Sequence, residues 1–162
     1  MYKRQLKDIS ADITPVITGF QGINEEGDIT TLGRGGSDTS AVALAVALEA
    51  EECQIYTDVA GVYTTDPNVY EKAKKIDKLT FEEMLELSSL GAKVLQIRSV
   101  EFASKYNMPI RVKSSFTNDE GTLINGEENM EDALISGVTH TNDDAKLTIR
   151  NCLLYTSDAA DD

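Results

Sequence analysis

The chain has 162 residues and is 41% hydrophobic, which fits a single globular domain with one core. Its formal net charge is -13, and this acidity argues against nucleic acid as a partner, because a basic face is needed to neutralise phosphates. We also expect no membrane partner, since the sequence holds no apolar run of about 18 residues.

The cysteine and histidine content bounds the chemistry further. Two cysteines, Cys53 and Cys152, are too few and too distant in sequence for a disulfide framework, so we expect a reduced, cytoplasmic protein. With His140 as the single histidine, the chain lacks the ligands of a zinc site, and we expect no metal held by protein ligands alone.

The first part of the chain predicts a strand, a turn and a helix. Residues 13–18 are rich in β-branched side chains and precede Gly19, which indicates a buried strand. Residues 21–30 are polar with two glycines, which is typical of a loop or a hairpin. After a glycine-rich turn, a stretch rich in Ala and Leu predicts a buried helix over residues 37–49.

The rest of the chain continues this alternation. Residues 53–57 predict a strand, and a long loop follows them. Thr80 and Glu83 have the spacing of a capping box, which predicts a helix over residues 80–90. Further elements are expected at residues 92–106 (a helix stopped by Asn107 and Pro109), 110–112 and 122–124 (strands). Strands that alternate with helices indicate an α/β fold with a mainly parallel sheet.

Three segments carry candidate chemistry, and the first is the glycine-rich turn TLGRGGSD. Its glycines let a ligand approach the backbone, and the N–H groups at the start of the following helix favour an anion. Arg34 suits a carboxylate or a phosphate, while Ser37 or Asp38 can cap the helix. The alternative is a tight strand-to-helix turn with a surface arginine.

The second segment is the loop after the predicted strand 53–57. Thr57 and Asp58 stand at the carboxyl end of that strand, where open α/β sheets bind ligands, and Tyr63 can offer its ring or hydroxyl to a nucleotide. The alternative is an Asx-turn at Asp58 and a packed tyrosine.

The third segment begins the predicted helix 92–106. Lys93 in a first helical turn opposes the helix dipole, and a bound phosphate would remove that objection. A solvated lysine that is tolerated at small cost explains the pattern equally well.

Together, and in this order, the three segments resemble the aspartokinases of the amino acid kinase family. The matching stretches span about residues 13–150 and are PVITGFQG, TTLGRGGSDTSAVALA, IYTDVAGVYTTDP, FEEMLELSSLGAKVL, PIRVKSSF and GTLI. The resemblance implies a three-layer α/β/α fold with a mainly parallel central sheet. It also implies truncation at the N-terminus, because the family begins with a strand and a Lys-Phe-Gly-Gly-Thr-Ser turn that is absent before Ile13.

The resemblance implies a kinase that transfers the γ-phosphoryl of ATP to the side-chain carboxylate of L-aspartate, the first step toward lysine, threonine and methionine. Mg²⁺ would be bound with the nucleotide. Asp38 would be catalytic and would orient a lysine of the missing N-terminal lobe. The residues implied to bind aspartate are Arg34, Gly35, Gly36 and Ser37, and those implied to bind the nucleotide are Thr57, Asp58, Tyr63, Lys93 and Val94.

The resemblance also divides the chain. Residues 1–126 would be the C-terminal part of the kinase domain, and residues 127–150 a linker and the start of a truncated ACT-type regulatory domain. Residues 151–162 read as a non-native tail. We expect the whole protein to be oligomeric through ACT domains, and the 162-residue chain alone to be inactive because it lacks the catalytic lysine.

One position departs from the family pattern, and two other functions stay open. Asn68 follows Pro67 where the family usually has an arginine that contacts a nucleotide phosphate. Another amino acid kinase, of the glutamate type, is one alternative, which Arg34 and Ser37 disfavour. A non-catalytic module that senses nucleotide or amino acid on the same fold is the other. The joint presence of Asp38, Thr57, Asp58 and Lys93 argues against it.

Overall fold

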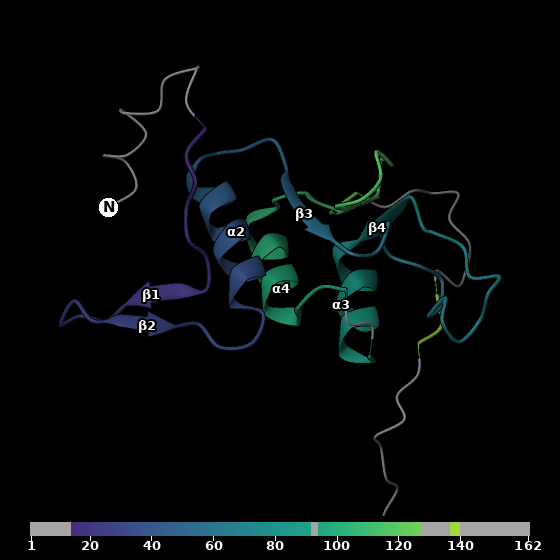
Figure 1. Cartoon of the computed structure of the whole chain (residues 1–162), viewed down its shortest axis with the longest axis horizontal. Coiled ribbons are helices and arrows are strands. Elements are labelled where there is room, and N and C mark those ends of the chain that lie inside the picture. Colours follow the sequence, from purple (N-terminus) through teal and green to yellow (C-terminus); the bar gives the residue numbers. More distant parts are fainter. Residues whose placement is uncertain (1–13, 92–93, 128–136, 140–162) are drawn as a thin grey trace, which may run out of the picture.

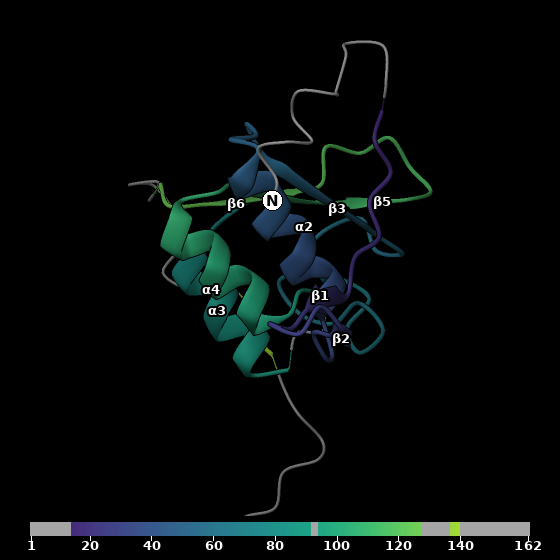
Figure 2. The ribbon, with the colours of Figure 1, turned by 90° about the vertical axis from the view of Figure 1, so that its left-hand side faces the viewer.

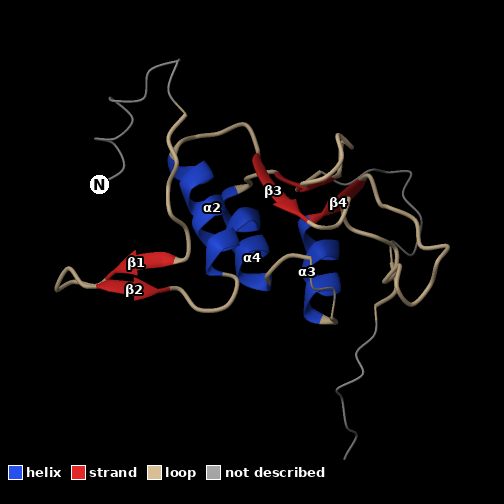
Figure 3. Ribbon diagram, viewed as in Figure 1, coloured by secondary structure: helices blue, strands red, loops and turns tan. Residues whose placement is uncertain are grey.

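The computed structural model describes residues 14–91, 94–127 and 137–139. Figures 1 and 3 show a small hairpin set apart from a larger sheet with helices. The elements, in chain order, are β1 (Gln21–Ile23), β2 (Ile29–Thr31), α2 (Gly36–Ala47), β3 (Cys53–Thr57), β4 (Lys78–Thr80), α3 (Phe81–Ser89), α4 (Ile97–Tyr106), β5 (Ile110–Ser114) and β6 (Thr122–Asn125).

The larger sheet has four strands in the order β3-β5-β6-β4. The β3–β5 and β4–β6 pairs are parallel, and β5 and β6 are antiparallel. This mostly parallel sheet with its helices confirms the predicted α/β fold class. In the described part of the chain, α2, α3 and α4 lie on one face of the sheet (Figure 2).

The core lies between that face of the sheet and the three helices. Along β5 the buried Ile110, Val112 and Ser114 alternate with half-buried Arg111 and Lys113, as the two-residue period of a strand requires. From the helices and the neighbouring strands, the side chains with no more than 2% exposure include Val42, Leu79, Met84, Val100, Ala103 and Ile124.

Cys53, the first residue of β3, is a free cysteine buried in this core. Burial raises the pKa of its thiol to about 11, from an ordinary value of 9.0. The thiol is therefore protonated at neutral pH and protected from solvent, which makes it a poor nucleophile.

Two helix ends follow the sequence prediction. The Glu83 N–H donates to Thr80 Oγ1 (3.2 Å), and the Thr80 N–H donates to Glu83 Oε2 (2.8 Å), which completes the expected capping box of α3. Asn107 ends α4 in the left-handed conformation, with φ 49°. Helix α4 packs against both α2 and α3, so it is the central helix of the layer (Figure 1).

The start of α4 differs from the prediction. The helix begins at Ile97 with Gln96 as its N-cap, rather than at residue 92. Val94 and Leu95 pack into the core from an irregular segment, and Leu95 keeps only 3% exposure, so burial does not require these residues to be helical. Lys93 lies outside the described residues.

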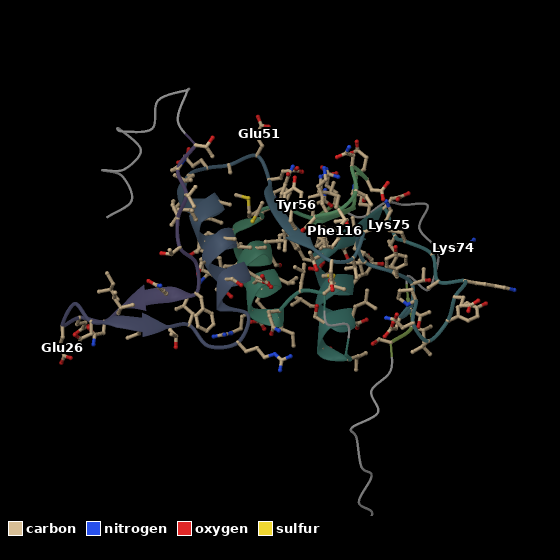
Figure 4. All side chains as sticks on the ribbon, in the orientation of Figure 1. Glu26, Glu51, Tyr56, Lys74, Lys75 and Phe116 are labelled. Carbon is tan, nitrogen blue, oxygen red and sulfur yellow. The ribbon has the colours of Figure 1, made fainter. Side chains whose placement is uncertain are left out.

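The N-terminal prediction was partly wrong. Thr14–Thr18 are exposed and irregular, and the Val16 side chain is 95% exposed. Their β-branched side chains favour an extended chain, but no strand of the described residues pairs with them. Residues 21–30 do form a hairpin, in which β1 and β2 are antiparallel. The hairpin projects away from the helices, with Glu26 at its tip (Figure 4).

Other parts of the prediction are not tested by the structure. None of the helices among the described residues has the length and apolarity that a membrane span requires. The predicted regulatory segment and the predicted tail, residues 127–150 and 151–162, lie almost entirely outside the described residues. Both stay predictions.

Candidate active site

The glycine-rich turn joins β2 to α2, and its backbone depends on glycine. Gly33 and Gly35 have φ angles of 75° and 72°, in the left-handed region that other residues rarely adopt. Gly35 is the N-cap of α2, and no side chain caps the helix. The predicted cap at Ser37 or Asp38 was wrong, because α2 begins at Gly36 and both residues lie in its first turn.

The turn is also tightly packed. A Cβ on Gly35 would overlap the side chain of Gln96, the N-cap of α4. A Cβ on Gly36 would lie 2.8 Å from the Leu32 Cβ and 3.0 Å from the Phe20 ring. These glycines therefore let segments that are distant in sequence approach the start of α2.

The segment before β1 is tied to the same helix end. The Phe20 N–H donates to Ser40 Oγ (3.1 Å), and the Leu32 N–H donates to the Phe20 carbonyl (3.0 Å). Arg34 and Ser37 are exposed beside this contact. The four residues implied to bind aspartate, Arg34, Gly35, Gly36 and Ser37, thus lie at the junction of the turn and the first residues of α2.

Asp38 is half-buried one residue further along α2. Burial raises the pKa of its carboxyl above the ordinary value of 3.8, and hydrogen bonding to the Gln96 backbone and the Ser37 side chain opposes this rise. Gln96 has no side-chain cap of its own, so Asp38 also stabilises the N-terminal end of α4. A structural role for Asp38 therefore accompanies the predicted catalytic one.

Thr57 and Asp58 are placed as the sequence predicts. Thr57 is the last residue of β3, its Oγ1 donates to Asp58 Oδ1 (3.0 Å), and its carbonyl accepts from the Ser115 N–H (2.8 Å). Asp58 is exposed at the carboxyl end of the parallel β3–β5 pair. Phe116 follows β5 at the same edge and is 80% exposed (Figure 4).

Tyr63 is half-buried in the loop that follows, where it forms an antiparallel bridge with Lys75. The loop is fixed by Thr122 of β6, whose Oγ1 accepts from the Val62 N–H (2.9 Å) and donates to the Ile76 carbonyl (2.5 Å). Sequence reasoning placed Thr122 in a strand but gave no signal of this role, because the bond joins residues sixty positions apart.

The two sets of residues lie toward one end of the fold. Helices α2 and α4 run side by side in the same direction, and each leads into the next strand of the parallel pair (Figures 1 and 3). The N-terminal ends of both helices therefore lie toward the carboxyl edge of β3 and β5, where ligands bind in open α/β sheets. Val94 lies in the segment before α4 and partly buries its side chain against the core.

No metal site accompanies these residues in the described part of the chain, since no group of three or more His, Cys, Asp or Glu side chains is placed to hold an ion. Sequence reasoning also missed Gln96 and Arg98 of α4. Arg98 donates from Nη2 to the carbonyls of Leu32 (2.9 Å) and Arg34 (2.8 Å). An arginine in a first helical turn that holds no acidic residue was the one available signal.

Comparisons with known proteins point in one direction. Residues 3–114 match the sequence model of the amino acid kinase family. An aspartate kinase of Stutzerimonas stutzeri is 63% identical over 150 residues, which covers 91% of this chain and 36% of that protein. The chain thus spans about a third of the length of the curated relatives that it matches.

Solved structures give the same indication. Escherichia coli aspartokinase III in complex with aspartate and ADP is 44% identical, with a TM-score of 0.65, over 69% of this chain and 25% of that chain. An aspartate kinase of Clostridium acetobutylicum is 33% identical, with a TM-score of 0.67, over 74% of this chain and 28% of that chain.

The packing of the turn can be tested with two glycine variants that share a left-handed backbone. Gly27 has φ 92° with nothing within 4 Å of an added Cβ, whereas a Cβ on Gly35 would overlap Gln96. We expect Gly27→Ala to lower the free energy of unfolding by about 1 kcal/mol through backbone strain. Gly35→Ala should cost about 1–3 kcal/mol more, because of overpacking. Urea unfolding measures both, and equal losses would contradict the tight contact.

The burial of Asp38 predicts a pH dependence of stability. Because its pKa is raised above 3.8 in the folded state, the folded chain holds this proton more tightly than the unfolded chain does. The contribution is fully present below pH 3.8 and is lost as the pH rises through the folded pKa. The free energy of unfolding of wild type minus that of Asp38→Asn should therefore fall as the pH is raised from 3.8, as measured by urea unfolding. A difference that rises with pH would contradict this.

Proposed function

The chain belongs to the amino acid kinase family, and from that premise we propose that it acts in the phosphorylation of the side-chain carboxylate of L-aspartate by ATP. The observation that carries the proposal is the glycine-rich turn at the start of α2, with exposed Arg34 and Ser37. The identity of 63% to an aspartate kinase supports aspartate as the substrate over glutamate.

In this proposal the turn holds aspartate. The Arg34 guanidinium pairs with its α-carboxylate through two parallel hydrogen bonds, and the N–H groups at the start of α2 add a favourable dipole. Gly35 and Gly36 line the site because they allow a ligand close to the backbone, and Ser37 offers a hydroxyl. The E. coli relative, solved in complex with aspartate and ADP, supports a site that takes this pair of ligands.

The nucleotide lies, in this proposal, at the carboxyl end of β3. Thr57 and Asp58 contact it there, Tyr63 contributes its ring or hydroxyl, and Val94 contacts it from the segment before α4. Lys93, which lies outside the described residues, would bind its phosphates as the family resemblance implies. Mg²⁺ would neutralise charge on the phosphates, as it does in phosphoryl transfer generally.

The chemistry asks for positioning rather than for a base. The aspartate carboxylate is ionised at pH 7, so one of its oxygens can form a bond to the γ-phosphorus while the bond from that phosphorus to the bridging oxygen breaks and ADP leaves. The protein therefore has to hold the two substrates in line and offset their negative charges. Asp38 would orient a lysine from outside the described residues, as the family resemblance implies. We also propose a cytoplasmic location, which the low cysteine content favours, and oligomers of the whole protein.

A chimera tests this function, because the chain covers only part of each relative. The 150 matched residues of the S. stutzeri aspartate kinase are replaced by the corresponding residues of this chain. We expect phosphorylation of aspartate, trapped as the hydroxamate, at a rate close to that of the unaltered relative, and no phosphorylation of glutamate above the blank. A chimera that is folded but inactive with aspartate, or equally active with glutamate, would overturn the proposal.

Arg34→Ala in the same chimera tests the carboxylate contact. Loss of a charge-assisted pair that leaves its partner unpaired costs about 2–5 kcal/mol, so KM for aspartate should rise steeply while KM for ATP changes little. Arg34→Lys keeps the positive charge but loses the two-pronged donor geometry of arginine, so its KM for aspartate should lie between those of the unaltered chimera and Arg34→Ala. Equal effects on both substrates would contradict the assignment.

Asn68→Arg tests the departure from the family pattern. In the structure the Asn68 N–H and Nδ2 both donate to Asp66 Oδ1 (2.8 and 3.0 Å), so this side chain closes a turn instead of reaching outward. We expect the arginine to tighten ATP binding by roughly 0.5–2 kcal/mol and to leave aspartate binding unchanged. Asn68→Ala controls for loss of the turn contact. Unchanged or weaker ATP affinity would show that another residue already fills the role.

A further inference from the structure

The glycine-rich turn is held from behind by a residue of another helix. Arg98 lies in the first turn of α4, more than sixty residues further along the chain. Its Nη2 atom donates to the carbonyl oxygens of Leu32 (2.9 Å) and Arg34 (2.8 Å). The same Nη2 lies 3.8 Å from the position that a Cβ would take on Gly33. A single guanidinium nitrogen thus donates hydrogen bonds to two backbone carbonyls of the turn.

These two bonds fix the direction of two backbone N–H groups. All peptide bonds of the described residues are trans, so each carbonyl points opposite to the N–H that follows it. With the Leu32 and Arg34 carbonyls turned toward Arg98, the N–H groups of Gly33 and Gly35 point away from it. Neither N–H donates to another described residue. Two donors are therefore presented together on the face of the turn opposite to Arg98.

The first turn of α4 is an unfavourable place for an arginine. The first turn of α4 has no acidic residue, and a cation there is disfavoured by the helix dipole. Without Arg98, nothing in the described residues would hold the two carbonyls, and their oxygens could rotate toward an approaching anion and repel it. The two carbonyl contacts are thus the reason that the structure offers for this charge.

Given the proposed aspartate site, we propose that Arg98 is a positioning residue for it. Arg98 does not contact the substrate in this proposal. By holding two carbonyls on one face of the turn, it directs the Gly33 and Gly35 N–H groups toward a carboxylate on the other face. Arg34 then forms the charge-assisted pair with that carboxylate from the same turn, while Arg98 keeps the two backbone N–H groups oriented toward it.

The test uses the whole 162-residue chain labelled with ¹⁵N and titrated with L-aspartate. In wild type, the amide resonances of Gly33 and Gly35 should shift on titration. In Arg98→Ala, the dissociation constant should rise about tenfold, as expected for two lost hydrogen bonds. The titration shifts of the two glycine amides should be lost. Arg98→Lys should regain part of both, since an ammonium group can donate to the same carbonyls. Lys105→Ala, which removes a cation from the last turn of the same helix, is the matched control and should bind as wild type does.

The outcomes separate this inference from the function on which it rests. Wild-type affinity and unchanged glycine shifts in Arg98→Ala would overturn the positioning role and leave the aspartate site standing. No aspartate-dependent shift at the turn in wild type would count against the aspartate site, and the inference would fall with it. If Arg98→Ala loses the dispersed spectrum of a folded chain, Arg98→Met keeps the aliphatic stem without donors, and the same comparison decides the question.

Discussion

The close approach of the start of α2 to the start of α4 is the contact on which the rest of the candidate site depends. Gly35 allows it, because any side chain there would occupy the space of Gln96. Asp38 faces the Gln96 backbone across the same junction, and Arg98 closes it by binding two carbonyls of the turn. The conformation of the turn is therefore set by a second helix and not by the local sequence alone.

The loop after β3 is built on the same plan from a different part of the chain. Thr122 of β6 holds Val62 and Ile76, and a Cβ on Gly61 would lie 2.5 Å from the Thr122 hydroxyl. In both places a glycine leaves room for the side chain of a distant element, Gln96 beside Gly35 and Thr122 beside Gly61, and a polar group of that element binds the backbone nearby. The central helix α4 and the sheet thus serve as the rigid support, and the exposed residues, such as Arg34 and Asp58, stand on loops fixed from behind.

Sequence reasoning succeeded where the signal is local. The capping box at Thr80, the stop at Asn107 and the position of Thr57 at a strand end all depend on neighbouring residues, and the structure has all three. It failed where packing at long range decides. Residues 13–18 have the composition of a strand, but no described strand pairs with them. The helical pattern from residue 92 gives no hint that Leu95 is buried, and Val94 partly buried, in an irregular segment. Arg98 could not be assigned, because its partners lie sixty-four and sixty-six positions away.

That sequence separation has a consequence for the order of folding. A contact between residues more than sixty positions apart has to close a long loop, which carries an entropic cost. This cost falls once the elements between the two residues have folded, because the flexible part of the loop is then shorter. The contacts of Arg98 with the turn can therefore form only after the sheet and α4 are in place. We expect the contact between the turn and α4 to form late in folding and to open before the core does.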